Sequence, residues 1–119
     1  MTTADIHQLS IESVSTSEGF RVIRLSGWVT AKNNLQVEEA IDQARGMNAV
    51  LDMTAVPYVD SAGLGSLLRG YVACQKYGGQ FVLAGPVPRV RDLLQLTKVA
   101  SLFPTFSTVD EAVSSLAKK

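Results

Sequence analysis

Apolar and polar residues alternate with a period of two in the first part of the chain. Leu9, Ile11 and Val14 are separated by polar neighbours, and a second run extends from Phe20 to Gly27. This period is typical of strands that bury one face. The short polar connection at Ser17–Gly19 predicts that the two strands pair as an antiparallel hairpin.

A helical period replaces the alternation after residue 32. The helix is predicted to begin at Asn33 or Asn34, because Asn33 and Gln36 have the spacing of a capping box, and to end at Gly46. Its apolar positions are Leu35, Val37, Ala40, Ile41 and Ala44. A nearly continuous apolar run over Ala49–Asp52 then predicts a strand that is covered on both faces.

A long helix and another strand follow. The helix is predicted to start at Leu64 and to stop at Gly78 and Gly79, and a strand over Gln80–Ala84 comes next. The apolar stripe of this helix consists of Leu64, Leu67, Leu68, Tyr71 and Val72. Residues at this spacing form one face of a helix, and we expect that face to be buried.

Two helices and a short strand complete the pattern. Pro88 suits the first turn of a helix, where a missing N–H costs nothing. The expected buried face of this helix is Val90, Leu93, Leu94 and Thr97. A strand over Phe103–Phe106 contains Pro104, which favours a sheet edge. Thr108 and Glu111 have the spacing of a capping box for the last helix. The inward positions of that helix are Ala112, Val113 and Leu116.

The predicted element order is β-β-α-β-α-β-α-β-α, which indicates an α/β fold. Alternating strands and helices favour a mixed, mostly parallel sheet of about five strands with four helices. A chain of 119 residues is long enough for one domain and too short for two. We expect a single domain over residues 1–119, with a core of about residues 8–116.

Composition and charge restrict the class of protein. Hydrophobic residues make up 46% of the chain, as in globular domains. Eleven basic residues balance eleven acidic ones, so neither nucleic acid nor a membrane surface is an expected partner. The one cysteine, Cys74, excludes an internal disulfide and fits a reducing compartment. Without a span-length apolar run, and with no signal core near Met1, a cytoplasmic location is expected.

The residue inventory argues against an enzyme. His7 is the only histidine and Cys74 the only cysteine, so neither a His-paired nucleophile nor a Cys/His metal cluster can be assembled, and no metal or cofactor is expected. A nucleophile elbow around Ser61 would need glycine where Val59 stands. A dinucleotide fingerprint at Gly63 would need a small residue where Leu68 stands.

The run Asp60-Ser61-Ala62-Gly63-Leu64-Gly65 remains the most informative motif. It places a serine at a helix N-terminus, where unpaired N–H groups and the helix dipole tolerate an anion. A plain helix cap is the simplest interpretation of Asp60 and Ser61. Two glycines in a first helical turn, however, cost up to ~1 kcal/mol each relative to alanine. We therefore expect an exposed small-residue surface that Ser66 and Gly70 continue.

The segment Val56–Gly65 resembles the signature of STAS domains, the bacterial anti-sigma factor antagonists. The resemblance extends over nearly the whole chain and includes Leu25–Gly27, Gly78–Gly79 and Val99–Phe106. It implies that the unphosphorylated protein binds an anti-sigma factor that is also a serine kinase, which releases a sigma factor. It further implies that the kinase phosphorylates Ser61 and that a serine phosphatase reverses this step.

The resemblance and the small-residue surface together give a predicted docking site. Its residues are Trp28, Thr30, Asp60, Ser61, Ala62, Gly63, Gly65 and Ser66. Trp28 is included because exposed tryptophans are enriched in interface hot spots. The family commonly has Gly-Glu-Leu-Asp where this chain has Gly27-Trp28-Val29-Thr30, so Thr30 stands in place of an acidic residue.

Two other functions remain open at this stage. The protein could be a non-catalytic STAS subunit of a larger assembly, such as a lipid-transport ATPase or a multi-STAS signalling complex, with Ser61 only part of a helix cap. A small nucleotide-binding module is the third interpretation. The sequence also leaves a homodimer open.

Overall fold

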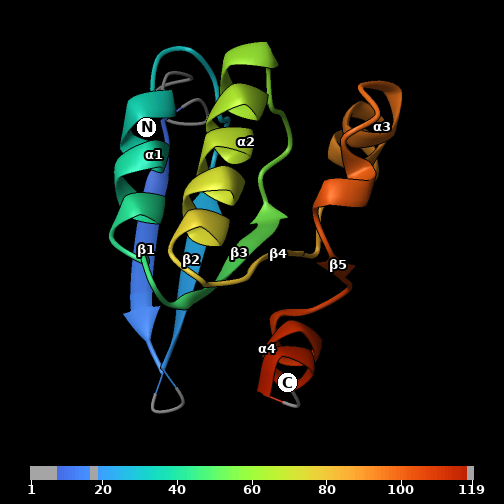
Figure 1. Cartoon of the computed structure of the whole chain (residues 1–119). Helices are drawn as coiled ribbons and strands as arrows, with labels where there is room; N and C mark the ends of the chain where they lie inside the picture. The colour runs from blue at the N-terminus through green and yellow to red at the C-terminus, as the bar shows by residue number, and fades with distance from the viewer. Residues whose placement is uncertain (1–7, 17–18, 118–119) are drawn as a thin grey trace.

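A five-stranded sheet in the order β1-β2-β3-β4-β5 forms the centre of the computed structural model (Figure 1). The structure describes residues 8–16 and 19–117, so His7 and the turn residues Ser17 and Glu18 lie outside the described residues. The strands are β1 Ser10–Ser15, β2 Phe20–Ser26, β3 Asn48–Ala55, β4 Phe81–Ala84 and β5 Thr105–Phe106.

The first two strands pair antiparallel, and every later pair is parallel. One row of side chains crosses four strands, from Val14 through Val22 and Val50 to Val82. The predicted hairpin is therefore confirmed, as is the position of the Pro104-containing segment at a sheet edge.

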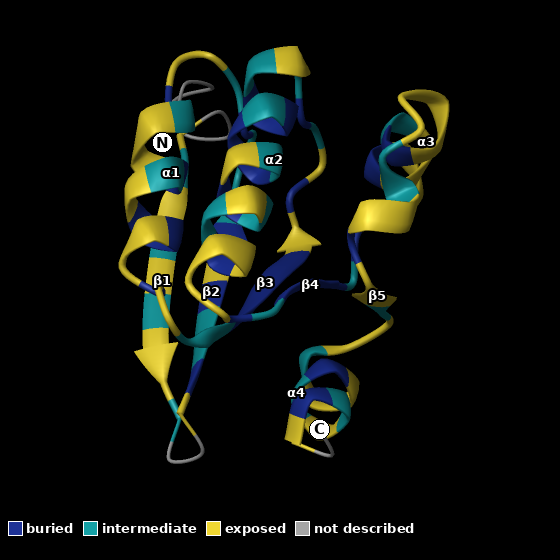
Figure 2. Cartoon of the chain, viewed as in Figure 1, coloured by how far each residue is buried: buried dark blue, intermediate teal, exposed yellow. Residues whose placement is uncertain are grey.

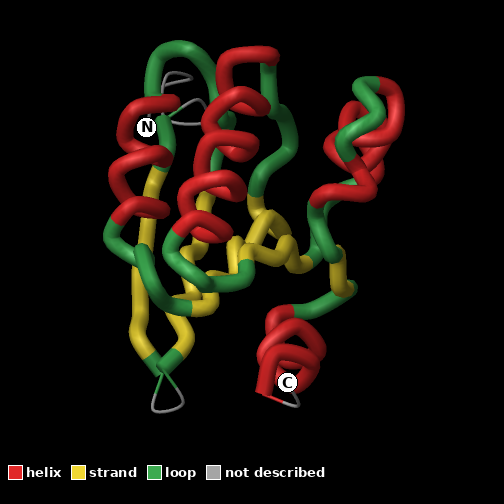
Figure 3. Tube along the Cα trace, viewed as in Figure 1, coloured by secondary structure: helices red, strands yellow, loops and turns green. Residues whose placement is uncertain are grey.

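Four α-helices connect or follow the strands. They are α1 Asn34–Asp42, α2 Ser61–Lys76, α3 Pro88–Leu96 and α4 Val109–Ala117, with a short 3-10 helix, η2, at Ala100–Leu102. The helices α1 and α2 run side by side along one face of the sheet (Figures 1 and 3). Ala112 and Leu116 of α4 pack with Val50 and Val82 in a separate cluster. The predicted mixed, mostly parallel α/β architecture is confirmed.

The buried residues follow the predicted apolar pattern with four exceptions, one in β1, where Val14 is 57% exposed, and three in the helices. Val37, Ala40, Ile41 and Ala44 are buried, as are Leu64, Leu67, Val90, Leu94, Ala112 and Leu116. Three positions predicted to be apolar contacts of their helices are exposed instead, namely Leu35, Val72 and Thr97. Leu35 is 73% exposed because, at 3.6 residues per turn, it lies on the opposite side of α1 from the buried Val37 and Ile41.

Helix ends agree with part of the predicted signals. Gly78 directly follows the C-cap residue of α2 with a positive φ angle of 84°, which favours glycine and confirms the predicted end of that helix. The predicted end of α1 at Gly46 is wrong, because α1 ends at Asp42, whereas Gly46, with a φ angle of 81°, belongs to the turn that follows. Pro88 is the first residue of α3, and the Thr108 hydroxyl accepts a hydrogen bond from the Glu111 N–H at 3.1 Å. The capping box predicted at Asn33 is wrong, because the Asn33 side chain makes no cap hydrogen bond.

None of the described helices has both the length and the apolar character needed to cross a bilayer.

Candidate functional site

Two loops meet where β2 and β3 end. The Gly27 N–H donates to the Ala55 carbonyl at 3.0 Å, and the Val29 N–H donates to the Tyr58 carbonyl at 3.0 Å. The Asp60 N–H returns a bond to the Val29 carbonyl at 3.1 Å. Because β2 and β3 are parallel neighbours, their carboxyl ends open on the same edge of the sheet. Segments about 30 residues apart in sequence thus form one surface.

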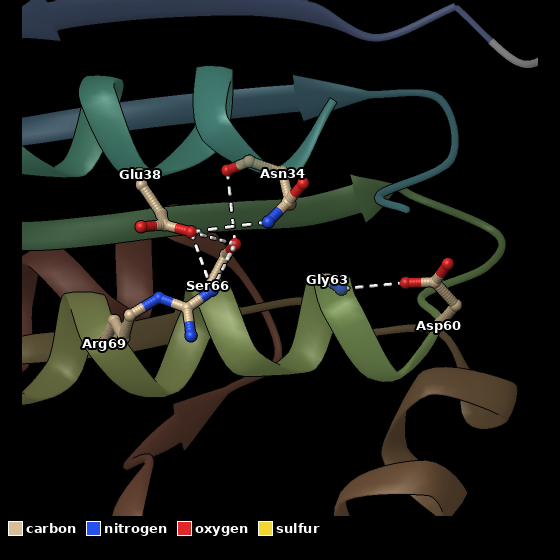
Figure 4. Close-up of polar contacts among 6 residues, drawn as sticks. All are labelled: Asn34, Glu38, Asp60, Gly63, Ser66 and Arg69. Carbon is tan, nitrogen blue, oxygen red and sulfur yellow. Dashed lines mark hydrogen bonds and ion pairs between the residues drawn. The ribbon is translucent and has the colours of Figure 1, made fainter. Parts of the chain in front are cut away.

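Asp60 holds this surface to the start of α2. One oxygen of its carboxylate accepts from the Gly63 N–H at 2.8 Å (Figure 4). The other oxygen accepts from the Ala31 N–H at 3.1 Å. The first bond satisfies an N–H that the helix leaves unpaired. Asp60 is therefore the N-cap, and α2 begins at Ser61, three residues before the predicted start at Leu64.

Asn33 fixes the same loop from within. Its side-chain oxygen accepts from the Thr30 N–H at 3.0 Å, and its amide nitrogen donates to the Trp28 carbonyl at 2.9 Å. The residue is 8% exposed. The amide that was expected to cap α1 thus closes the turn that carries Trp28 and Thr30.

Ser61 is the first residue of α2 and is exposed. Its hydroxyl makes no hydrogen bond within the part of the chain that the structure describes. The N-terminal end of a helix carries a partial positive charge and tolerates negative groups. Since Asp60 supplies the cap, the Ser61 hydroxyl is not used in capping and faces solvent.

The small residues further along α2 are not the surface that the sequence predicted. Gly63, Ser66 and Gly70 are buried. A methyl group on Gly63 would lie 2.3 Å from the Val29 carbonyl oxygen, and one on Gly70 would lie 2.8 Å from two side-chain carbons of Ile41. These residues allow α2 to approach the loop and α1 closely. Of the predicted docking residues, Gly63 and Ser66 thus lie beneath the surface, whereas Ala62 and Gly65 are half-buried.

Ser66 belongs to a polar network between α1 and α2 that sequence reasoning missed (Figure 4). Its hydroxyl lies 2.8 Å from a carboxylate oxygen of Glu38 and 3.2 Å from the Asn34 carbonyl oxygen. Arg69 donates to the same Glu38 oxygen at 2.7 Å. These donors, Arg69 first and Ser66 second, lower the pKa of Glu38 below its ordinary value. The sequence did contain one indication of this network, because a serine on the buried side of an apolar helix needs a polar partner on a neighbouring element.

An aromatic and cationic stack lies beside a hollow that Asp60, the residue before Ser61, also lines. The rings of Trp28 and Tyr58 lie 4.9 Å apart, and the Arg89 guanidinium lies 5.0 Å from the centre of the Tyr58 ring. A hollow of about 360 Å³ opens beside them, lined by Trp28, Thr30, Ala31, Lys32, Tyr58 and Asp60. Tyr58 stands two residues before Asp60 in the signature motif, yet sequence reasoning assigned it no role.

The described residues contain no group of three His, Cys, Asp or Glu side chains that could hold a metal ion. Cys74 is buried, and burial raises the pKa of its thiol. A buried thiol with a raised pKa is a poor nucleophile, which is consistent with a packing role for this residue.

Comparisons with known proteins identify the family. The family model described as the STAS domain matches residues 13–112. An Anti-sigma F factor antagonist from Paenibacillus polymyxa is 26% identical over 102 residues, which cover 82% of this chain and 87% of that protein. The crystal structure of an anti-sigma factor antagonist from Mycobacterium paratuberculosis is 25% identical, with a TM-score of 0.81 over 91% of this chain and 93% of that one.

The fold also matches the anti-sigma factor antagonist SpoIIAA in two states. Its unphosphorylated form has a TM-score of 0.78 at 20% identity and covers 92% of this chain and 98% of that one. The phosphorylated form of SpoIIAA from Bacillus has a TM-score of 0.70 at 21% identity and covers 90% of this chain and 99% of that one. At these identities the likeness shows the fold alone.

Proposed function

This chain belongs to the STAS domain family, and from that premise we propose that it is an anti-sigma factor antagonist switched by phosphorylation at Ser61. The exposed hydroxyl of Ser61 at the start of α2 carries the proposal. The unphosphorylated protein binds an anti-sigma factor with serine kinase activity, and this binding releases a sigma factor. A serine phosphatase restores the binding form. The domain acts as a substrate and a binding partner, not as an enzyme.

The physical effect of a phosphate at Ser61 supports a switch in binding. Phosphorylation adds about −1.5 to −2 charges at neutral pH. The N-terminal end of α2 tolerates this charge, so the fold is kept. A partner docked on the same surface meets like-charge repulsion and desolvation instead. SpoIIAA has this fold in both its phosphorylated and its unphosphorylated form, which supports the expectation that a phosphate leaves the fold intact.

The docking surface that we propose is the part of the site that reaches solvent, in which Ser61 and Arg89 are exposed and the other residues are half-buried. It consists of Trp28, Thr30, Asp60, Ser61, Ala62 and Gly65, to which the geometry adds Tyr58 and Arg89. The predicted residues Gly63 and Ser66 are buried and do not reach this surface. They influence it indirectly, by setting how closely α2 packs on its neighbours. Thr30 and Trp28 replace residues that are common in the family, so they are candidates for setting which partner binds.

Phosphate uptake tests the proposal directly. The protein is incubated with ATP and serine kinases encoded in the same genome, and intact mass is measured. We expect one added phosphate, lost in Ser61→Ala. Ser66→Ala is the matched control because Ser66 lies on the same helix but is buried, and this variant should still be phosphorylated. If the wild-type protein takes up no phosphate from any of these kinases, the domain is better explained as a constitutive STAS subunit of a larger assembly.

The proposal also covers the extent of the domain, its location and its partners. Residues 1–119 act as one domain in the cytoplasm. Neither nucleic acid nor a membrane is a direct partner. Size-exclusion chromatography with light scattering would separate a monomeric switch from a homodimer.

A further inference from the structure

A second apolar hollow lies on the outer side of α2, in its C-terminal half. Leu68 is half-buried there, whereas Val72 is 61% and Tyr77 46% exposed. With Ala73 and three cations they line a hollow of about 450 Å³. Figure 2 shows exposed and intermediate residues along this part of α2. Large apolar side chains that are held in a hollow and left open to solvent are typical of a docking surface.

Three cations surround this hollow, namely Arg45, Arg69 and Lys76. Arg45 stacks on the Tyr77 ring, with its guanidinium carbon 4.6 Å from the ring centre, and the Lys76 ammonium lies 6.0 Å from the same centre. Arg45 also donates to the Tyr77 hydroxyl at 3.4 Å. The Tyr77 ring and the Arg45 guanidinium are therefore held together before any partner arrives, and the Lys76 ammonium lies at the outer limit of a cation–π contact.

The charges at the hollow are of one sign. Within the described residues no carboxylate lines it. The acidic partners of the two arginines, Asp42 and Glu38, lie on α1, and the arginine side chains are still 47% and 58% exposed. Lys76 forms no ion pair with any described residue. An apolar strip between exposed cations is complementary to a strip of apolar side chains between acidic ones.

From this complementarity we infer that the outer face of α2 is a second docking surface, and that its occupant is an acidic amphipathic helix of a partner protein. An apolar face at helical spacing fits between Leu68, Val72 and Tyr77, and flanking carboxylates meet Arg45, Arg69 and Lys76. A membrane or nucleic acid fits less well. The chain has a net charge of zero, and three cations beside Asp42 and Glu38 give no extended positive field.

The apolar part of this surface is separate from the proposed switch, and the two surfaces border each other at Arg69, whose guanidinium lies close to Gly65. Val72 lies 11 residues after Ser61, which corresponds to about 16 Å along a helix. That distance exceeds the screening length of roughly 8 Å at physiological salt. A phosphate on Ser61 should therefore leave the second surface open, so that one partner can remain bound while the other is released.

Titration with a designed helix tests this inference. The probe is a stapled peptide of about four turns with leucines on one face and glutamates beside them. Its counterpart has lysine at every glutamate position. We expect the acidic peptide to shift the amide resonances of residues 68–77 in nitrogen-15 spectra, and the basic peptide to shift none of them.

Substitutions then locate the binding. Val72→Asp and Lys76→Glu change exposed positions, so the fold should be kept, and each should raise the dissociation constant at least about fivefold. Leu96→Asp is the matched control, because Leu96 is 81% exposed on α3. This variant and Ser61→Asp should both stay within about twofold of wild type.

Four results would overturn the inference. One is the absence of any shift with the acidic peptide. Another is equal binding by Val72→Asp. A third is loss of binding in Ser61→Asp, which would make the hollow part of the switch. The last is co-sedimentation with phosphatidylglycerol vesicles that Lys76→Glu abolishes, which would identify a lipid surface as the occupant. Because no kinase is used, these results are independent of whether Ser61 is phosphorylated.

Discussion

Gly63 and Gly65 are separated by one residue on α2, yet their surroundings predict opposite responses to an added methyl group. A methyl on Gly63 would lie 2.3 Å from the backbone oxygen of Val29, which cannot move without shifting the loop. A methyl on Gly65 would meet only the end of the Arg69 side chain, at 3.4 Å or more. One glycine is therefore required by a close approach, and the other is not.

Urea unfolding of Gly63→Ala and Gly65→Ala measures this difference. We expect Gly63→Ala to lower the free energy of unfolding by about 1–3 kcal/mol, because a backbone clash outweighs the gain in helix propensity. Gly65→Ala should be neutral or stabilising by up to ~1 kcal/mol. Equal destabilisation by both variants would mean that the approach of the loop to α2 is looser than the structure indicates.

A second prediction for a single residue is that Ser61→Asp lowers the affinity for the partner without lowering the stability of the fold. A carboxylate at the first position of α2 should be neutral or favourable by about 0.3–1 kcal/mol, because it lies at the positive end of the helix. Near-UV circular dichroism should therefore remain native, while affinity for the anti-sigma factor falls. Ser61→Ala, which keeps the surface uncharged, is the control and should still bind. Loss of the native spectrum in Ser61→Asp would show that the residue is not exposed.

In helix α2, the apolar period predicts the burial of some residues correctly and of others wrongly. The period of large side chains predicted the burial of Leu64 and Leu67, and it assigned Val72 wrongly. It also treated Gly63, Ser66 and Gly70 as a free surface, because a small residue adds nothing to an apolar stripe. Their spacing of three and four residues is itself helical, and it marks the side on which a neighbour approaches closely. This spacing is visible in the sequence, but its role in close packing can be recognised only once the position of α1 is known.

The ion pair between α1 and α2 predicts a dependence of stability on pH. Arg69 and Ser66 lower the pKa of Glu38 below its ordinary value of 4.5. A carboxyl group with a lowered pKa in the folded state contributes stability above the unfolded pKa, and this contribution is lost as the pH falls through the folded value. The effect is modest, because the Glu38 side chain is 27% exposed and its partner 58% exposed.

The measurement compares wild type with Glu38→Gln over a range of pH. At neutral pH the variant should be less stable, and the difference should shrink once the pH falls below 4.5. Glu39→Gln changes the adjacent residue, which is exposed and outside the network, and should give a smaller and flatter difference. A difference for Glu38→Gln that does not vary with pH would contradict the role of its charge.

On the scale of the whole molecule, the order of elements could be predicted and the composition of the site only in part. Alternation, helical periods and turn residues gave the five strands and four helices in their correct order. The STAS-like motif identified Asp60 and Ser61. The contacts of Tyr58 with Trp28 and with Arg89 could not be predicted, because they depend on the register between β2 and β3 and on the position of α3. Such contacts join segments that no local pattern connects.

The two faces of the sheet are expected to unfold as one unit. Residues of β3 alternate between the clusters, since Ala49 and Leu51 pack with α1 and α2 whereas Val50 packs with α4. Loss of α4 would therefore expose the strand that also supports the switch surface. A single transition follows if neither cluster is stable without the other.

Leu116→Ala tests this coupling from the end of the chain furthest in sequence from Trp28. Leu116 is 3% exposed, so the substitution should cost about 2–4 kcal/mol. Trp28, the only tryptophan, reports on the site by fluorescence, and far-UV circular dichroism reports on the whole chain. Both signals should shift to the same lower urea midpoint. Leu96→Ala removes an exposed leucine and should change stability by less than about 0.5 kcal/mol. If α4 melted first while the Trp28 signal kept its wild-type midpoint, the two faces would be independent, and the switch surface would not depend on the packing behind it.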